Sequence, residues 1–314
     1  MSYIEVISRN KTEYYYATKN IRVGPTKWKK IRKFLGDVKP AGKSLAAAMA
    51  SIEKEAERRG YRPRQPTDLL DPVDAEKLED VRDAFKKWYG KLQPEVREKY
   101  QSEFLIRFTY NTNAIEGNRL SLRETAMILK EGIIPAGAEV NDYNEALNAR
   151  DALELMKRHD GGLSKRFLLK LHRETTKNTG CRLVGEYRDC GVGITGSDWI
   201  PPPPDQVPGK MKQLITWYNN HRALDHPVEL AATIHTRLAQ IHPFTDGNGR
   251  VARLVLNWIL LKSGYPMFYI EVRDKIHYYE ALEAADKGDL KSSIKYVATN
   301  IIDQFTFTSK SESE

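Results

Sequence analysis

The chain has 314 residues, 40% of them hydrophobic and 29% charged, and a net charge of +8 with histidine neutral. This length and apolar content indicate a globular protein with a sizeable core. The sequence contains neither an apolar run of about 18 residues nor a signal-peptide pattern, so it does not predict a membrane or exported protein. We therefore expect a cytoplasmic protein, and the spacing of Cys181 and Cys190 supports neither a zinc site nor a disulfide framework.

The positive charge is concentrated near the N-terminus. Residues 1–64 hold 16 Lys and Arg against 6 Asp and Glu, whereas the other 250 residues hold 34 against 36. Three segments rich in Tyr, Ile, Val and Trp predict a three-stranded β-meander here: Tyr3–Ile7, Tyr14–Val23 and Trp28–Leu35. Its last strand is crowded with basic residues close to aromatic ones: Lys27, Lys29, Lys30, Arg32 and Lys33, with Trp28 and Tyr14 to Tyr16 nearby.

Two interpretations fit this basic sheet. In the first, the sheet packs on the main domain and its solvated charges discourage pairing with other strands. In the second, the basic and aromatic side chains bind nucleic acid or another acidic partner. The following segment is not a phosphate-binding loop, because five residues separate Gly36 from Gly42 where that motif needs four.

The middle of the chain predicts helices. Residues 43–59 are helix-prone up to Gly60, and Arg62–Pro66 is typical of a linker. Further amphipathic segments predict helices over 74–92, 94–108, 143–158 and 164–178. We therefore expect a mainly α protein, a helical bundle with a small sheet, divided into a basic meander at 1–42, a helical linker region at 43–99, a main domain at 100–305 and a polar tail at 306–314.

Glu116 ends one of these helical segments, and Gly117 is available for a left-handed cap. Ser121 and Glu124 then form the capping-box pattern that starts another helix. Because a carboxylate at a helix C-terminus opposes the helix dipole, we expect Glu116 to pair with an arginine from elsewhere in the chain.

Residues 184–200 predict a short β-hairpin that is followed by the rigid Pro201–Pro204 run. An exposed strand edge can bind an extended peptide through backbone hydrogen bonds. The residues that would do so here are Val192, Gly193, Ile194 and Thr195. The alternative is an ordinary surface loop.

The stretch His242–Arg253, HPFTDGNGRVAR, combines several chemical groups in twelve residues. Pro243 ends the preceding helical segment at His242. A neutral imidazole near a bound nucleotide can take the proton from an attacking hydroxyl at physiological pH. His242 is therefore the candidate general base.

The same stretch predicts a phosphate site. Three residues form a tight turn at the N-terminus of a buried helix: Gly247, Asn248 and Gly249. The free N–H groups and the dipole of such a helix end attract anions, and Arg250 and Arg253 extend from its first turns. Asp246 would repel phosphate without a divalent cation, so it predicts Mg²⁺.

This stretch resembles the signature of Fic-domain proteins and matches it at every fixed position. The resemblance implies an all-helical fold and the transfer of AMP from ATP to a protein hydroxyl, with His242 as the base, Asp246 on Mg²⁺ and Phe244 as a buried anchor. The phosphate ligands implied by the resemblance are Gly247, Asn248, Gly249, Arg250 and Arg253. A branch of the family that transfers phosphate has lysine in place of the second glycine, and Gly249 argues against that branch.

Residues 112–117 resemble the inhibitory motif of the same family, Ser/Thr-x-x-x-Glu-Gly/Asn. The resemblance implies that Glu116 pairs with Arg253, withdraws it from the γ-phosphate of ATP and silences the enzyme, and that the same carboxylate supports removal of AMP. It makes residues 184–200 a flap that clamps the target protein. It also implies that Tyr279 stacks on adenine, whereas Asp286 replaces the asparagine of relatives.

We therefore hypothesise a protein adenylyltransferase that uses Mg-ATP to modify a hydroxyl side chain of a target protein. The alternative is a nucleic-acid-associated regulator, in which the basic sheet binds nucleic acid and the Fic domain only senses ATP. A second copy of the chain, giving a homodimer, is a further predicted partner, and no membrane is expected.

Overall fold

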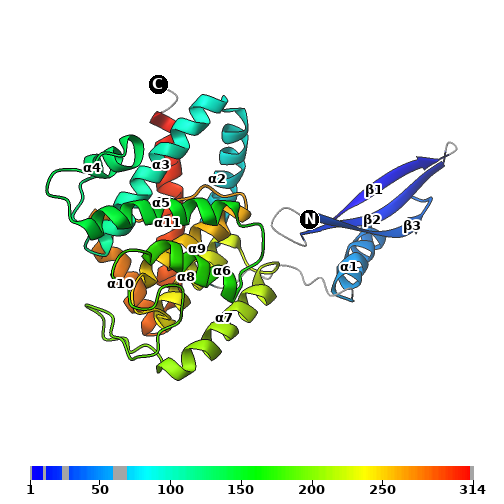
Figure 1. Cartoon of the computed structure of the whole chain (residues 1–314). Coiled ribbons are helices and arrows are strands. Elements are labelled where there is room, and N and C mark those ends of the chain that lie inside the picture. Colours follow the sequence, from blue (N-terminus) through cyan, green and yellow to red (C-terminus); the bar gives the residue numbers. More distant parts are fainter. Residues whose placement is uncertain (1, 10–11, 23–27, 59–68, 312–314) are drawn as a thin grey trace. The chain divides into compact units, whose positions relative to one another are not determined.

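The computed structural model describes residues 2–9, 12–22, 28–58 and 69–311. The chain divides into two compact units, one formed mainly by residues 1–67 and the other by residues 68–220 and 226–314. As predicted, the fold is mainly α with one small antiparallel sheet (Figure 1). Within these ranges no helix has the length and apolar character that a membrane span requires.

The N-terminal unit contains the predicted meander. Strands β1 (Ser2–Arg9), β2 (Thr12–Arg22) and β3 (Trp28–Gly36) pair antiparallel in that order. Helix α1 (Gly42–Arg58) packs Ala48 and Ile52 on Ala17 and Ile31. The predicted boundary between residues 42 and 43 would separate α1 from the sheet, but α1 supplies half of the only apolar cluster found among the described residues of this unit.

The second unit is a bundle of helices. Their bounds are α2 Pro72–Lys91, α3 Pro94–Ile115, α4 Leu122–Ala126 with a π-helical turn at Met127–Glu131, α5 Val140–Arg158, α6 Lys165–Thr176, α7 Val207–His221, α8 Pro227–Ile241, α9 Asn248–Lys262, α10 Lys275–Asp286 and α11 Leu290–Ser311. Two short 3₁₀ turns lie at Pro204–Gln206 and Val272–Asp274. The predicted capping box of Ser121 and Glu124 opens α4.

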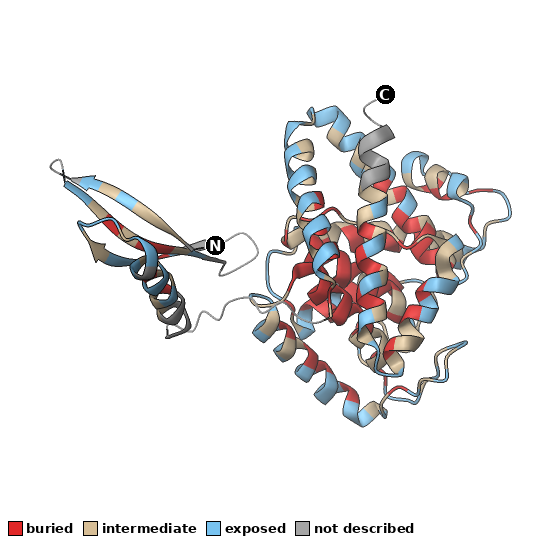
Figure 2. Ribbon diagram, turned by 180° about the vertical axis from the view of Figure 1, so that it is seen from behind, coloured by how far each residue is buried: buried red, intermediate tan, exposed pale blue. Residues whose placement is uncertain are grey.

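Helix α9 lies at the centre of this bundle. Every residue from Val251 to Leu260 is buried, as expected for a helix that is apolar on all sides. Figure 2 shows the buried core running through the middle of the helical unit. Because α9 is enclosed, the turn that precedes it is held on a rigid support.

Two predictions about elements fail. Residues 184–200 contain no strand. The Arg188 N–H, which a strand ladder could use, donates to the Pro243 carbonyl instead. Helix α11 continues to Ser311, so most of the predicted tail at 306–314 is helical. The sequence patterns also missed α7 and α11. The predicted linker Arg62–Pro66, Lys27, the side chains of Trp28 and Lys29, and residues 312–314 lie outside what the structure describes.

Candidate active site

The side chain of Asn248 holds the loop between α8 and α9 in its conformation. The amide of Asn248 donates to the Phe244 carbonyl and accepts from the Phe244 N–H, both at 2.9 Å. Phe244 is fully buried and stacks on His172, with ring centroids 3.8 Å apart. Gly247 then caps α9 with φ of 75°, a conformation that favours glycine. The Asn248 side chain therefore shapes the loop.

His242 ends α8 in the left-handed conformation, with φ of 48°. Its Nδ1 lies 3.2 Å from the Ala239 carbonyl, which can only accept, so Nδ1 carries the proton and Nε2 holds the basic lone pair. Burial lowers the pKa of His242, although the hydrogen bond to Ala239 and the charge of Glu116 act in the opposite direction. The imidazole is thus neutral at pH 7 and able to accept a proton.

A second histidine, His172 on α6, binds the backbone of this loop. The Gly185 N–H donates to His172 Nδ1 at 3.0 Å, so Nε2 carries the proton and donates to the Asp246 carbonyl at 3.0 Å. Burial lowers the pKa of His172 to about 4. His172 therefore stays neutral and fixes the backbone on which the Asp246 carboxylate stands. No local sequence pattern marks this role.

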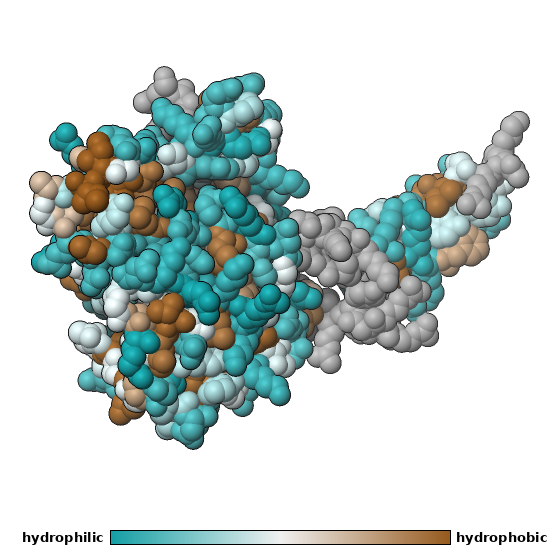
Figure 3. All heavy atoms as spheres, in the orientation of Figure 1, coloured by the Kyte–Doolittle hydropathy of each residue, from teal (hydrophilic) through white to brown (hydrophobic). Residues whose placement is uncertain are grey.

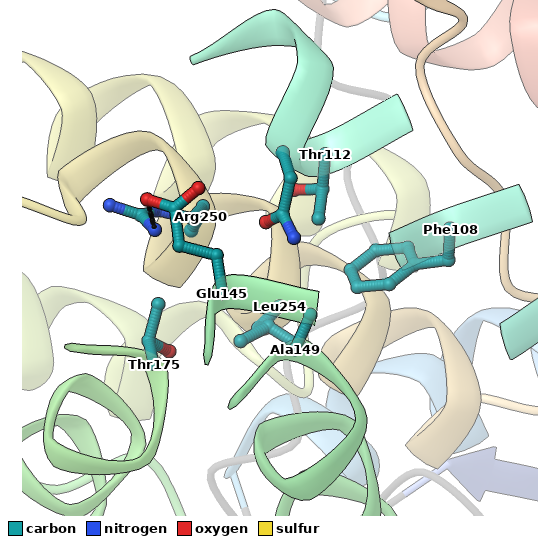
Figure 4. Close-up of a pocket in the computed structure, with 8 residues that line it drawn as sticks. Phe108, Thr112, Glu145, Ala149, Thr175, Arg250 and Leu254 are labelled. Carbon is teal, nitrogen blue, oxygen red and sulfur yellow. Dashed lines mark hydrogen bonds and ion pairs between the residues drawn. The ribbon is translucent and has the colours of Figure 1, made fainter. Parts of the chain in front are cut away.

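Arg250 is held between two carboxylates. Its Nη1 donates to Glu145 Oε1 at 2.7 Å, and its Nη2 lies 3.0 Å from both oxygens of Asp246. Asn118 Nδ2 donates to the other oxygen of Glu145 at 2.8 Å. Figure 4 shows Glu145 facing Arg250. Both residues line a small cavity of ≈ 10 Å³ together with Thr175. Glu145 is a site residue that the sequence analysis did not identify.

Arg253 is the deeper of the two arginines. Its Nη2 donates to Glu116 Oε1 at 2.6 Å, and its Nε and Nη2 donate to the hydroxyl and carbonyl of Thr112, both at 2.8 Å. Burial alone would lower the pKa of Arg253, but the charge of Glu116 raises it overall. The structure therefore contains the ion pair that the motif at residues 112–117 predicts.

The Glu116 carboxylate also lies against the glycine turn. A Cβ atom on Gly249 would collide with Glu116 Oε1 and would come within 3.0 Å of Arg253 Nη1. Gly249 is in the first turn of α9, where N–H groups and the helix dipole attract anions. Glu116 therefore occupies an anion site with its own carboxylate.

Tyr279 and Asp286 lie on α10, at the edge of this site. Tyr279 is partly exposed, and its hydroxyl donates to the Ile115 carbonyl at 3.5 Å, next to Glu116. Burial raises the pKa of Tyr279 to about 12, so it is protonated. Asp286 accepts from Gln240 Nε2 at 3.0 Å, which ties it to the end of α8.

The predicted flap is an irregular segment with firm anchors. Arg188 Nε donates to the His242 carbonyl at 2.8 Å, and the Arg188 N–H donates to the Pro243 carbonyl at 2.9 Å. Trp199 Nε1 donates to the Gln240 carbonyl at 2.9 Å. Between these anchors four residues alternate between half-buried and exposed, and the last of them begins a turn: Val192, Gly193, Ile194 and Thr195.

No cluster of three or more His, Cys, Asp or Glu in the described ranges could hold a metal ion alone. The Asp246 carboxylate is 50% exposed beside the glycine turn. Mg²⁺ commonly binds through one or two carboxylates together with phosphate oxygens. This donor set fits a magnesium ion that arrives with a nucleotide rather than one held in a protein cage.

Comparisons with known proteins agree with this geometry. Residues 162–260 match the Fic/DOC family model. A solved Fic-domain-containing signaling protein from Bacteroides thetaiotaomicron is 30% identical, with a TM-score of 0.67, covering 74% of this chain and 94% of that one. The chain belongs to the Fic/DOC family.

Curated relatives of this Fic protein are named as enzymes. Protein adenylyltransferase fic-1 of Caenorhabditis elegans is 32% identical over 275 residues, 85% of this chain and 53% of the relative. Protein adenylyltransferase Fic of Nematostella vectensis is 33% identical over 201 residues, 62% of this chain and 47% of the relative. A structure of C. elegans Fic-1 is 28% identical with a TM-score of 0.66, covering 85% of this chain and 76% of that one. The chain spans about half the length of the curated relatives it matches.

Proposed function

We propose that this Fic protein transfers AMP from Mg-ATP to a hydroxyl side chain of a target protein and that Glu116 inhibits the transfer. One observation carries the proposal: a neutral base, His242, stands beside a glycine-bounded helix N-terminus that already holds an anion, the Glu116 carboxylate. The relatives named protein adenylyltransferase support the same reaction class.

The chemistry follows from the groups in place. His242 Nε2 takes the proton of the target hydroxyl as its oxygen attacks the α-phosphorus of ATP. A bond forms between that oxygen and phosphorus, the bond from phosphorus to the bridging oxygen of the β-phosphate breaks, and pyrophosphate leaves with the electron pair. The N–H groups at the start of α9 and the charge of Arg250 stabilise the phosphate oxygens. The target retains AMP.

Magnesium belongs to this proposal through Asp246. When bound, the ion would neutralise phosphate charge and orient the leaving pyrophosphate. The contribution of the chain is the carboxylate itself, oriented by Arg250 Nη2 and by the Gly247 N–H, which donates to Asp246 Oδ1 at 2.5 Å. Half of the Asp246 side chain remains open to solvent and to ligands.

Inhibition is a competition for one anion site. Arg253 cannot bind a phosphate while Glu116 accepts from its Nη2 and the Glu116 carboxylate fills the space over Gly249. The bonds to Thr112 only hold the guanidinium in position. A guanidinium recognises carboxylate and phosphate alike. ATP that binds against Glu116 therefore lacks this arginine and holds its α-phosphate in a poor position for attack.

The same carboxylate supports removal of AMP from a modified target. Here Glu116 takes a proton from a water molecule, whose oxygen attacks the phosphorus of the linkage. The bond from phosphorus to the target oxygen breaks, and that oxygen takes the proton that His242 Nε2 holds in this direction. AMP is then released. Tyr279 stacks on the adenine in both directions, and residues Val192 to Thr195 bind the target segment by backbone hydrogen bonds.

The alternative function is a nucleic-acid-associated regulator whose Fic domain only senses ATP. It shares the nucleotide site but requires no transfer.

The homodimer and the cytoplasmic location stay predictions. Apolar side chains do gather on the face of the helical unit that carries α4 (Figure 3), and sedimentation of the purified chain would give the number of copies. The exposed apolar residues of this region are Leu122, Ile133, Ile134 and Val140.

A labelling experiment with the full chain tests the proposal. The Glu116→Gly chain is incubated with ATP labelled on the α-phosphate and, separately, on the γ-phosphate, and protein-bound label is counted. We expect label from the α-phosphate alone, and His242→Ala in the same background should abolish it. His277→Ala is the matched control, because His277 is an exposed histidine bound only to Asp274 in the described contacts. Retention of a tenth or more of the activity in His242→Ala contradicts the assigned base.

A further inference from the structure

The N-terminal sheet has one covered face and one open face. Helix α1 packs on the face that carries Ala17 and Ile31 (Figure 1). Side chains alternate along a strand, so the open face carries the intervening residues of β2. Directly opposed residues show which side chains gather there: Tyr3, Thr18 and Arg32 in one row, and Glu5, Tyr16 and Phe34 in the next.

One end of the open face is aromatic. Phe34 is 56% exposed although it is a large apolar side chain. The ring centroids of Tyr16 and Tyr14 lie 5.3 and 6.1 Å from that of Phe34, with the rings tilted. These three rings, which we call the aromatic cluster, come from two strands of one sheet and meet on its solvent side. No apolar residue of α1 covers them in the described contacts.

The other end of the open face is basic. Arg32 Nε and Nη2 donate to the Glu5 carboxylate at 2.7 and 2.9 Å, and Lys30 Nζ donates to it at 2.7 Å. Lys30 Nζ also lies 5.8 Å from the centroid of the Tyr3 ring. Lys30 and Arg32 share the single carboxylate of Glu5, so these three residues together keep a net positive charge. The whole segment of residues 1–64 carries 16 basic against 6 acidic residues.

From this arrangement we infer that the open face of the sheet binds single-stranded nucleic acid. Bases stack on the aromatic cluster, while Lys30 and Arg32 contact the adjoining phosphates. Exposed rings and cations together fit this partner because every base offers a flat apolar face and every nucleotide a negative charge. A duplex fits less well, since its bases are stacked within the helix and cannot reach Phe34. The inference is independent of AMP transfer.

Fluorescence anisotropy of the full chain tests this inference. The probes are end-labelled oligothymidylate and oligouridylate of roughly twelve nucleotides, which match the site sizes of single-strand binding surfaces, and a duplex of mixed sequence. We expect the single strands to bind with an affinity that falls steeply between roughly 50 and 200 mM salt. Failure of both to bind at low salt, or tighter binding of the duplex, overturns the inference.

Matched variants separate a specific face from general charge. Phe34→Ala and Phe34→Leu should each weaken binding roughly tenfold or more, because stacking contributes about 1–3 kcal/mol per base. Val6→Ala is their control, since Val6 is 47% exposed but lies opposite Tyr15 on the covered side. Equal losses for Phe34→Leu and Val6→Ala would overturn the assignment of the aromatic cluster.

The basic end has its own matched pair. Arg32→Ala removes a charge from the open face, whereas Lys33→Ala removes the same charge from the next residue, which lies opposite Ala17 on the covered face. Arg32→Ala should weaken binding several-fold more than Lys33→Ala. Equal losses would mean that only the overall charge matters and would overturn the assignment of the face. Thermal unfolding of each variant checks that the sheet is intact.

Discussion

Arg250 and Arg253 lie three residues apart on α9, and both are almost fully buried against a glutamate from another helix. Glu145, on α5, is 16% exposed and is held in addition by Asn118. Glu116, at the end of α3, is 33% exposed and lies over Gly249. The two Arg–Glu ion pairs therefore differ in where the carboxylate lies: Glu145 orients Arg250 beside the anion site, whereas Glu116 occupies that site. In the proposed function, the position of the carboxylate decides whether a glutamate supports the transfer or inhibits it.

Removing the inhibitory carboxylate should have the largest effect. Glu116→Gly frees Arg253 and the space over Gly249, so AMP transfer should rise by about a hundredfold, the factor that a phosphate misplaced by about 1 Å can cost. Incorporation of α-phosphate label measures the rise. The same variant should lose removal of AMP from a target modified beforehand.

The two halves of this prediction fail separately. A transfer rate that is unchanged in Glu116→Gly would contradict inhibition by Glu116. Unchanged removal of AMP would contradict only its role in the reverse reaction. Glu124→Gly is not a suitable control because Glu124 caps α4, so Glu131→Gln, an exposed acidic residue, serves instead.

The glycine turn precedes the helix that carries both arginines, so a substitution in the turn should lower the stability of the fold rather than affect one arginine alone. In Gly247→Ala the new Cβ would lie 2.7 Å from Thr176 Cγ2, on a backbone with φ of 75°. Left-handed strain of this kind costs about 1–3 kcal/mol, and the clash adds to it. Urea unfolding should show a greater loss of stability than in Gly137→Ala, which has a φ of 79° and open space around its Cβ. Equal losses of stability in the two variants would mean that the clash with Thr176 does not contribute to the free energy of unfolding.

Glu145→Gln should have the opposite sign to Glu116→Gly. A neutral amide cannot balance the buried Arg250, and a hydrogen bond between charged groups contributes about 1.5–3 kcal/mol. In the Glu116→Gly background, we expect kcat/KM for ATP to fall by roughly tenfold. Glu154→Gln, on the same helix but paired with Lys157 at the surface, should leave it unchanged. A rise in Glu145→Gln would show that Glu145 also competes with phosphate.

The smallest expected effect is a shift in pH dependence. Burial lowers the pKa of His242 below its usual value of about 6.5, and protonated imidazole cannot act as a base. Transfer should therefore hold from pH 8 down to neutrality and fall only in acid. Because the charge of Glu116 raises this pKa, the inflection should lie lower in Glu116→Gly than in the wild type. An inflection that moves upward would contradict this electrostatic coupling.

Local pattern was enough to predict much of the fold and the centre of the site. The glycines and Pro243 dictate where α8 ends and α9 begins, and the apolar run after Arg250 dictates burial of α9. The meander and most helices follow from strand and helix periodicity. An arginine partner for Glu116 was expected because a carboxylate at a helix C-terminus opposes the helix dipole. That the partner is Arg253 was implied only by the resemblance to the Fic inhibitory motif.

What could not be predicted joins residues far apart in the sequence. Glu145 and Arg250 are separated by 105 positions, His172 and Asp246 by 74, and Arg188 and His242 by 54. No local spacing encodes such pairs. The hairpin at residues 184–200 was wrong for the same reason: the Arg188 N–H, which a strand ladder could use, donates to the distant Pro243 carbonyl.

The bond from Arg188 to the His242 carbonyl joins the segment that would receive the target to the residue that would deprotonate it. In the proposed function, target recognition and chemistry are thus linked through backbone carbonyls around the base. A target that seats badly on residues 192–195 would also disturb the base, so discrimination between targets should appear in kcat as well as in KM. Selectivity of this kind depends on how a target sits after it binds, and tight binding alone does not secure modification.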